Sequence, residues 1–150
     1  MLKESFGLPS QILPMPCCDD SSAAGPDLKQ PDRDSARVLW IGRITEVKRL
    51  EWLLDLAERH SDLSFDIVGA PNQDSAYSVQ LVRRAKGLGN VAMHGRVEER
   101  ELEAFYRRAA LLCCTSRTEG FPVTFLEAWR QGVPVVTTFD PDGVVAAHHL

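Results

Sequence analysis

The chain has 150 residues, of which 44% are hydrophobic and 25% charged, and its formal net charge is −4 at pH 7. That length and composition are typical of one globular domain with its own core. The acidic balance argues against a nucleic-acid-binding protein, which normally carries a basic excess. No apolar run approaches the roughly 20 residues that cross a bilayer. The N-terminal stretch is interrupted by glycine and proline and lacks the apolar segment of a signal peptide. We therefore expect a cytoplasmic protein, with peripheral membrane association left open for the full-length form.

The composition changes near residue 35. Residues 19–35 are rich in Asp, Ser and Pro and predict a long loop or linker. Residues 10–16 predict a short edge strand, because their prolines exclude them from a central position. We therefore divide the chain into a partly flexible N-terminal segment and interdomain linker region, residues 1–35, and one domain, residues 36–150.

From residue 36 on, strand-like and helix-like patterns alternate. Residues 37–41 predict a strand that ends at Gly42. Residues 48–60 predict an amphipathic helix, because its apolar positions recur at i, i+3, i+4 and i+7 as Leu50, Leu53, Leu54 and Ala57. The remaining expected elements are strands over 63–68, 90–94, 110–115 and 133–138, and helices over 75–86, 98–109 and 122–131; the helix over 98–109 should turn Leu102, Phe105 and Tyr106 inward.

Short apolar strands that alternate with helices are typical of a parallel sheet covered on both faces. We therefore predict an α/β fold, a doubly wound, Rossmann-like parallel sheet with helices on both faces. Ligands of such sheets bind at the carboxyl ends of the strands, so the residues that follow the strands should form the site. A sheet of this kind usually continues with a sixth strand, so we expect the domain to be incomplete at its C-terminus.

The four cysteines form two adjacent pairs, Cys17-Cys18 and Cys113-Cys114. Neither pair has the Cys-x-x-Cys spacing of a zinc site or redox motif. Cys113 and Cys114 lie in an apolar run, where buried cysteine acts as a small hydrophobe. We expect reduced structural thiols, no metal site and no cofactor.

The crossover after the first strand reads GRITEVK, residues 42–48. It contains neither a G-x-G-x-x-G dinucleotide fingerprint nor a P-loop. It offers two cations, Arg43 and Lys48, and the fork of an arginine with the point charge of a lysine suits a diphosphate. The alternative is that both are solvated surface charges.

A turn leads from the strand over 110–115 into the helix over 122–131. The unpaired N–H groups at a helix start favour an anion. Phe121 and Val123 are the better donors, because Pro122 has no N–H, and Gly120 lets a ligand approach the backbone closely.

Two glutamates flank this helix start. Glu119 would repel a phosphate, so it suits a neutral, hydroxyl-rich group such as a sugar. Glu127 lies one helical turn beyond Val123 and could accept hydrogen bonds from a ribose diol. The alternative is that Glu119 caps the helix and Glu127 is a surface charge.

Several segments, in the right order, resemble one known family. EGFPVTFLEAWRQGVPVV strongly resembles the E-x7-E motif of group 1 retaining glycosyltransferases with the two-domain GT-B fold, and VLWIGRITEVKRLEWLL resembles that family's Gly-Arg…Lys segment. The likeness covers about residues 37–145. In that family this half is the C-terminal domain, which binds the nucleotide-diphosphate-sugar donor. The resemblance implies a retaining, hexosyltransferase-like enzyme that needs no metal, and an acceptor-binding N-terminal domain absent from this chain. The chain alone should therefore be inactive.

The resemblance also implies a role for each site residue. Arg43 and Lys48 would contact the donor diphosphate, Glu119 the transferred sugar and Glu127 the ribose, with Arg43, Lys48 and Glu119 as the catalytic group. The other donor-binding positions would be Gly42, Arg96 and Val97, with the last two beside the base, and Gly120, Phe121, Pro122 and Val123 along the sugar and phosphates. The loop after the last strand departs from the Gly-Gly-x-x-Glu of many members, so contacts from it are in doubt. The alternative function is a non-catalytic nucleotide-sugar-binding or assembly module with the same fold.

Overall fold

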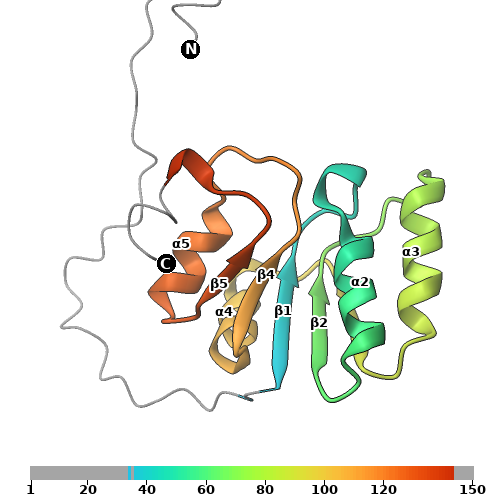
Figure 1. Ribbon diagram of the computed structural model, residues 1–150, viewed down its shortest axis with the longest axis horizontal. Coiled ribbons are helices and arrows are strands. Elements are labelled where there is room, and N and C mark those ends of the chain that lie inside the picture. The colour runs from blue at the N-terminus through green and yellow to red at the C-terminus, as the bar shows by residue number, and fades with distance from the viewer. Residues whose placement is uncertain (1–33, 35, 144–150) are drawn as a thin grey trace, which may run out of the picture.

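The structure, a computed structural model, describes residue 34 and residues 36–143. The edge strand expected over 10–16, most of the linker and Cys17-Cys18 lie outside these residues. The described part forms one parallel sheet of five strands in the order β3-β2-β1-β4-β5 (Figure 1). The strands are β1 (Arg37–Ile41), β2 (Ser64–Val68), β3 (Val91–Gly95), β4 (Leu111–Cys114) and β5 (Val135–Thr137). The helices are η1 (Glu46–Lys48), α2 (Leu50–Arg59), α3 (Ala76–Lys86), α4 (Glu99–Arg108), α5 (Val123–Arg130) and η2 (Pro141–Gly143).

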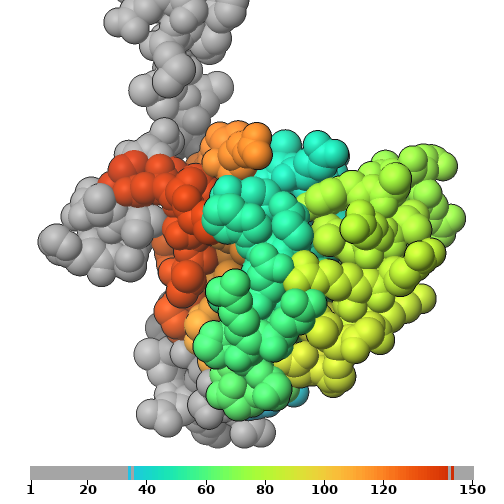
Figure 2. All heavy atoms as spheres, turned by 45° about the vertical axis from the view of Figure 1, so that its right-hand side comes forward, coloured from blue at the N-terminus to red at the C-terminus, as the bar shows by residue number. Residues whose placement is uncertain are grey.

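The sheet is covered on both faces. Because successive strand residues point to opposite faces, Val38 and Trp40 of β1 pack in one core cluster with α2 and α3, whereas Leu39 packs in another with α4 and α5. Figure 2 shows the side with α2 and α3, which lie next to each other. The predicted doubly wound, Rossmann-like fold is confirmed.

The apolar stripe of α2 is buried as predicted: Leu50, Leu53, Leu54 and Ala57 are all in the core. The predicted start of this helix is wrong, because residues 46–48 form the separate 3-10 turn η1 and α2 begins at Leu50. Between the two, Arg49 adopts the left-handed backbone conformation with φ of 46°. The apolar period marks the buried stripe but does not reveal a change in backbone direction at its edge.

The other elements differ from the predictions by one or two residues at their ends. α4 turns Tyr106 into the core, with Leu102 and Phe105 packed partly buried beside it, as expected. α5 is shorter than predicted, because Pro122 is its N-cap and residue 131 its C-cap. β5 is shorter than the apolar run that predicted it, because Val133 and Pro134 precede the residues that pair with β4.

Candidate functional site

β1 is the central strand of the sheet, with β2 on one side of it and β4 on the other. The loops after β1 and β4 therefore flank the point where strand order reverses, the usual ligand crevice of this sheet. In Figure 1 both loops lie at the upper edge of the sheet, with η1 above the start of α2. This arrangement brings together the two segments that the sequence singled out, residues 42–48 and 115–123.

Lys48 and Glu119 meet at this edge, although they are 71 positions apart in the chain. Lys48 Nζ forms an ion pair with Glu119 Oε1, and the side chains are only 23% and 17% exposed. The buried Ser116 donates to the same Oε1 from its Oγ, at 2.5 Å. The alternative that Glu119 caps α5 is excluded, because Pro122 is the N-cap and no side chain caps this end.

Thr115 connects the first crossover to the end of β4. Its Oγ1 accepts a hydrogen bond from Trp40 Nε1 at 3.0 Å and donates one to the backbone oxygen of Lys48 at 2.7 Å. Arg117, the residue after Ser116, donates from its backbone N–H to the carbonyl of Val47 at 2.8 Å. These bonds hold the backbone around Lys48 against the loop that carries Glu119.

Arg49 makes a second connection that the sequence analysis missed. Its guanidinium donates to the carbonyls of Thr115 and Ser116 at 2.8 and 2.9 Å, and to Thr138 Oγ1 at 2.8 Å. It also lies over the ring of Trp52, 3.8 Å from the centroid. The sequence carries no local signal for this role, because it depends on a left-handed backbone and on partners in two other loops.

The strand ends below the site are packed backbone to backbone. The N–H of Gly42 donates to the carbonyl of Val68 at 3.0 Å, and that of Gly69 to the carbonyl of Gly95 at 2.7 Å. A Cβ on Gly69 would lie 1.8 Å from the carbonyl oxygen of Gly42, so no side chain fits there. Arg43 is exposed beside this packed edge.

The start of α5 follows the loop that carries Glu119. Gly120 and Val123 are exposed, Pro122 is buried, and Phe121 packs edge-on against Trp129 with centroids 6.3 Å apart. The backbone N–H of Val123 has no acceptor among the residues that the structure describes. The side chain of Phe121 therefore packs against α5, and the start of the helix remains accessible.

Glu127 lies further along α5 and faces α4. Its Oε2 accepts a hydrogen bond from the hydroxyl of Tyr106 at 2.6 Å. Burial, together with the bond to Glu127, raises the pKa of Tyr106 well above its ordinary value, so the phenol stays protonated and donates. A hollow of about 230 Å³ adjoins this pair between α4 and α5, with Glu99 and Arg130 in its wall. Glu127 is therefore more than a solvated surface charge.

Arg96 and Val97 follow β3, where Arg96 is exposed and Val97 is half-buried against α4 and α5. They lie at the same edge of the sheet as Gly42, because the parallel strands end together there. Lys48 and Glu119 are thus in contact at this edge, whereas Glu127 faces a separate hollow between α4 and α5.

Cys113 is buried and Cys114 is half-buried, and both are free thiols. Burial raises the pKa of Cys113 to about 11, which keeps the thiol protonated and inert. Within residues 36–143, no group of three or more His, Cys, Asp or Glu side chains could hold a metal ion. The same stretch contains no helix of the length and apolarity needed to span a membrane.

Comparison with known proteins identifies the family. The chain matches the family model of glycosyl transferases group 1 over residues 35–148, and so belongs to this family. Its parallel sheet and paired layers of helices are those of the C-terminal domain of a GT-B glycosyltransferase.

The chain matches only part of the length of individual relatives. Mannosylfructose-phosphate synthase of Agrobacterium fabrum is 37% identical over 112 residues, which are 67% of this chain and 25% of that protein. The pneumococcal O-GlcNAc transferase GtfA, crystallised with UDP and GlcNAc, matches with a TM-score of 0.60 and 25% identity over 75% of this chain and 22% of that one. The C-terminal domain of the group 1 protein LpcC of Francisella tularensis matches with a TM-score of 0.59 and 23% identity over 70% of this chain and 58% of that one. The chain spans between 25% and 34% of the length of the curated relatives that it matches.

Proposed function

We propose that this chain binds the nucleotide-diphosphate-sugar donor of a retaining glycosyltransferase. The observation that carries the proposal is the convergence of Lys48, Glu119 and Ser116 at the switch point of the sheet. A cation for a phosphate and a carboxylate for sugar hydroxyls are thereby held side by side. Membership of the family and the GtfA structure with UDP and GlcNAc support the same ligand class.

The diphosphate would bind to the positive groups of this edge. Lys48 supplies a point charge and Arg43, which is exposed, can offer its fork to two oxygens. The free N–H of Val123 adds the positive end of α5. Together they would stabilise the charge that develops on the departing diphosphate, which is where such electrostatic catalysis acts.

The sugar would bind to Glu119. Lys48 and Ser116 both contact its Oε1, so Oε2 is the oxygen available to accept from a sugar hydroxyl. The exposed Gly120 would let the sugar lie close to the backbone. The nucleoside would continue toward α4, where Glu127 accepts from the ribose diol and the loop with Arg96 borders the base.

The reaction would break the bond between the anomeric carbon and the phosphate oxygen and form a bond from that carbon to the acceptor oxygen on the same face. The proton of the acceptor hydroxyl would pass to the released phosphate oxygen. Arg43, Lys48 and the start of α5 meet the diphosphate charge, so we expect no metal in this step. The acceptor would bind to a further domain of a longer protein, so the chain alone should bind donor without transferring sugar.

A titration of the chain with UDP-, GDP- and ADP-sugars, followed by NMR, tests this proposal. We expect shifts at Arg43, Lys48 and Glu127. Lys48→Ala should weaken binding by about tenfold, the effect of losing one charged contact, whereas Lys86→Ala, at the exposed end of α3, should not. No response to any of the nucleotide sugars would contradict the donor site.

A second experiment separates the enzyme from a non-catalytic nucleotide-sugar-binding module. In a protein that also carries the acceptor-binding domain, Glu119→Ala and Lys48→Ala should each abolish sugar transfer while the protein stays folded. Near-normal transfer by both variants would favour the non-catalytic module.

A further inference from the structure

We propose that Glu119 also distinguishes the intact sugar donor from the free nucleoside diphosphate that remains after transfer. This inference rests on the proposed function and concerns the same site. It assigns to the Lys48–Glu119 pair a role in the selection and release of ligands, beyond contact with the sugar.

Lys48 already has a counterion inside the domain. Its ammonium is paired with Glu119 Oε1, and both side chains are largely withdrawn from water. Charges in such a setting interact more strongly than exposed ones, because water screens them less. A diphosphate that binds to Lys48 must therefore compete with Glu119 for it.

Glu119 has little freedom to move away when a diphosphate binds to Lys48. Ser116, which donates to it, is buried, and the carbonyl of Ser116 accepts from both Arg49 and Thr138 Oγ1, the latter at 2.6 Å. The next residue is tied to η1 through the N–H of Arg117. The carboxylate therefore stays beside any phosphate that reaches Lys48.

The two ligands differ in what they offer this carboxylate. A sugar donor brings hydroxyl groups, which can donate to Oε2 as the diphosphate takes over Lys48. A free nucleoside diphosphate brings no hydroxyl to that position and carries one more ionisable oxygen on its terminal phosphate. Glu119 would then face an additional negative charge with only Ser116 as its donor, an unfavourable arrangement for a partly buried charge. Glu119 should therefore penalise the product and favour its release.

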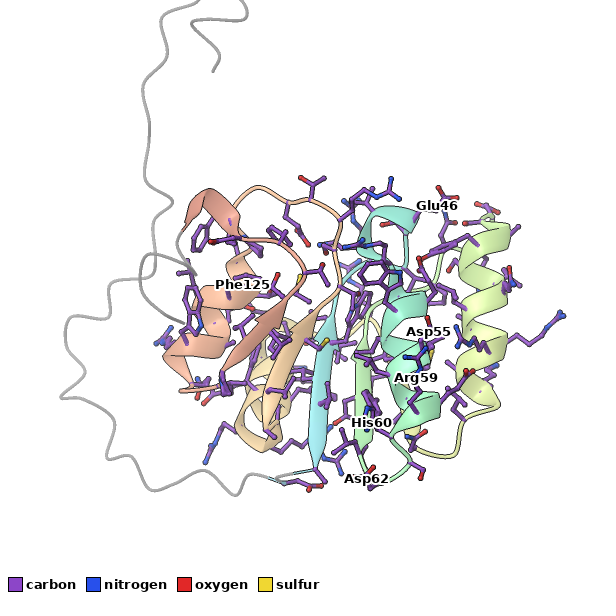
Figure 3. The ribbon with its side chains drawn as sticks, in the orientation of Figure 1. Glu46, Asp55, Arg59, His60, Asp62 and Phe125 are labelled. Carbon is purple, nitrogen blue, oxygen red and sulfur yellow. The ribbon has the colours of Figure 1, made fainter. Side chains whose placement is uncertain are left out.

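Isothermal titration of the 150-residue chain tests this inference with the pairs UDP and UDP-glucose, GDP and GDP-mannose, and ADP and ADP-glucose. Glu119→Gln removes the charge and keeps the shape of the side chain. We expect this variant to bind the nucleoside diphosphate about tenfold more tightly, equivalent to about 1.4 kcal/mol. Its affinity for the sugar nucleotide should not increase. Glu46→Gln is the matched control, because Glu46 is an exposed glutamate of the neighbouring η1 that points outward at the same end of the sheet (Figure 3). It should leave the ratio of the two affinities within about twofold.

A second variant keeps the inference testable if Glu119→Gln is poorly folded. Glu119→Asp retains the charge and shortens the reach, so the nucleoside diphosphate should bind as to the original chain while the sugar nucleotide binds more weakly. An unchanged affinity ratio in a chain that binds both ligands would overturn the inference and leave the proposed function standing. An equal increase in affinity for both ligands in Glu119→Gln would also overturn the inference and leave the proposed function standing. Failure of the original chain to bind any of the six ligands would overturn the proposed function and this inference together.

Discussion

Arg49 reaches the carbonyl of Thr115 at 2.8 Å from a left-handed backbone conformation. This contact joins the first crossover to the end of β4, across the point where the strand order reverses. A residue with a side chain is strained by about 1–2 kcal/mol in this conformation. The guanidinium bonds to Thr115, Ser116 and Thr138 offset that cost.

Substitution of Arg49 separates the strain from the contacts. Arg49→Ala loses the guanidinium bonds and keeps the left-handed strain, so we expect it to lower the free energy of unfolding by about 2–3 kcal/mol. Arg49→Gly loses the same bonds but relieves the strain, so it should be about 1 kcal/mol more stable than the alanine variant. Urea unfolding measures both. Equal stability of the two variants would show that the backbone at this position carries no strain.

The hydroxyl of Thr115 is the acceptor for a buried Trp40 N–H. Thr115→Val keeps the volume and leaves that N–H, and the carbonyl of Lys48, without a partner. We expect a loss of about 1–3 kcal/mol in the free energy of unfolding, and weaker binding of nucleotide sugars because Lys48 is held less well. The loss from Trp40→Phe in the Thr115→Val background should be smaller than the loss from Trp40→Phe alone, since no N–H then remains to satisfy. Additive losses in this double-mutant cycle would argue against a direct bond.

Gly69 lies against the carbonyl of Gly42, which a Cβ would approach to 1.8 Å. Gly69→Ala must therefore push two strand ends apart, and we expect a loss of stability of about 2 kcal/mol or more, as for other overpacked sites. Gly89→Ala is the control, because a Cβ there meets no atom within 4 Å, and its midpoint of thermal unfolding should change little. A Gly69→Ala variant as stable as the original chain would contradict the close approach of Gly69 to the carbonyl of Gly42.

Asp66 is a buried carboxylate of β2 with three basic partners. It bonds to His94 Nε2 at 2.6 Å and Arg37 Nη1 at 3.0 Å, and lies 3.5 Å from Arg108 Nη2. Burial alone would raise the pKa of this carboxyl, but the hydrogen bonds from His94 and Arg37 and the charge of Arg108 outweigh it, so the pKa lies below the ordinary value of 3.8. Its contribution to stability is therefore present above about pH 4 and is lost as the pH falls through the lower, folded-state pKa.

Asp66→Asn should accordingly destabilise the chain by about 2 kcal/mol at pH 7, because it removes the buried carboxylate that the partly exposed Arg37, His94 and Arg108 share. The difference from the original chain should narrow as the pH falls below about 4. Unfolding curves between pH 7 and pH 2.5 measure this, with Asp62→Asn as the control, since Asp62 is exposed in the loop before β2 (Figure 3). A difference that is constant over this range would show that Asp66 is not held ionised by these partners.

Much of the fold follows from local patterns in the chain. The alternation of short apolar runs with amphipathic helices predicted the parallel, doubly wound sheet, because each pattern reports which side of its own element is buried. The same patterns placed Lys48 and Glu119 at one edge, since parallel strands end together. Gly42 and Gly69, which follow β1 and β2, and Gly95, the last residue of β3, marked those ends in the sequence.

The contacts between side chains in the site could not be predicted from these local patterns. Whether Glu119 capped α5 or faced Lys48 depended on how the end of β4 lies against the first crossover, and therefore on the pairing of β1 with β4, Val38 with Leu111. Arg49 and Thr115 bridge that gap over 66 positions, and Tyr106 holds Glu127 over 21. Side-chain types and spacing along the chain carry no information about such contacts between distant residues. They arise because the packing of helices on both faces brings distant loops to one edge of the sheet.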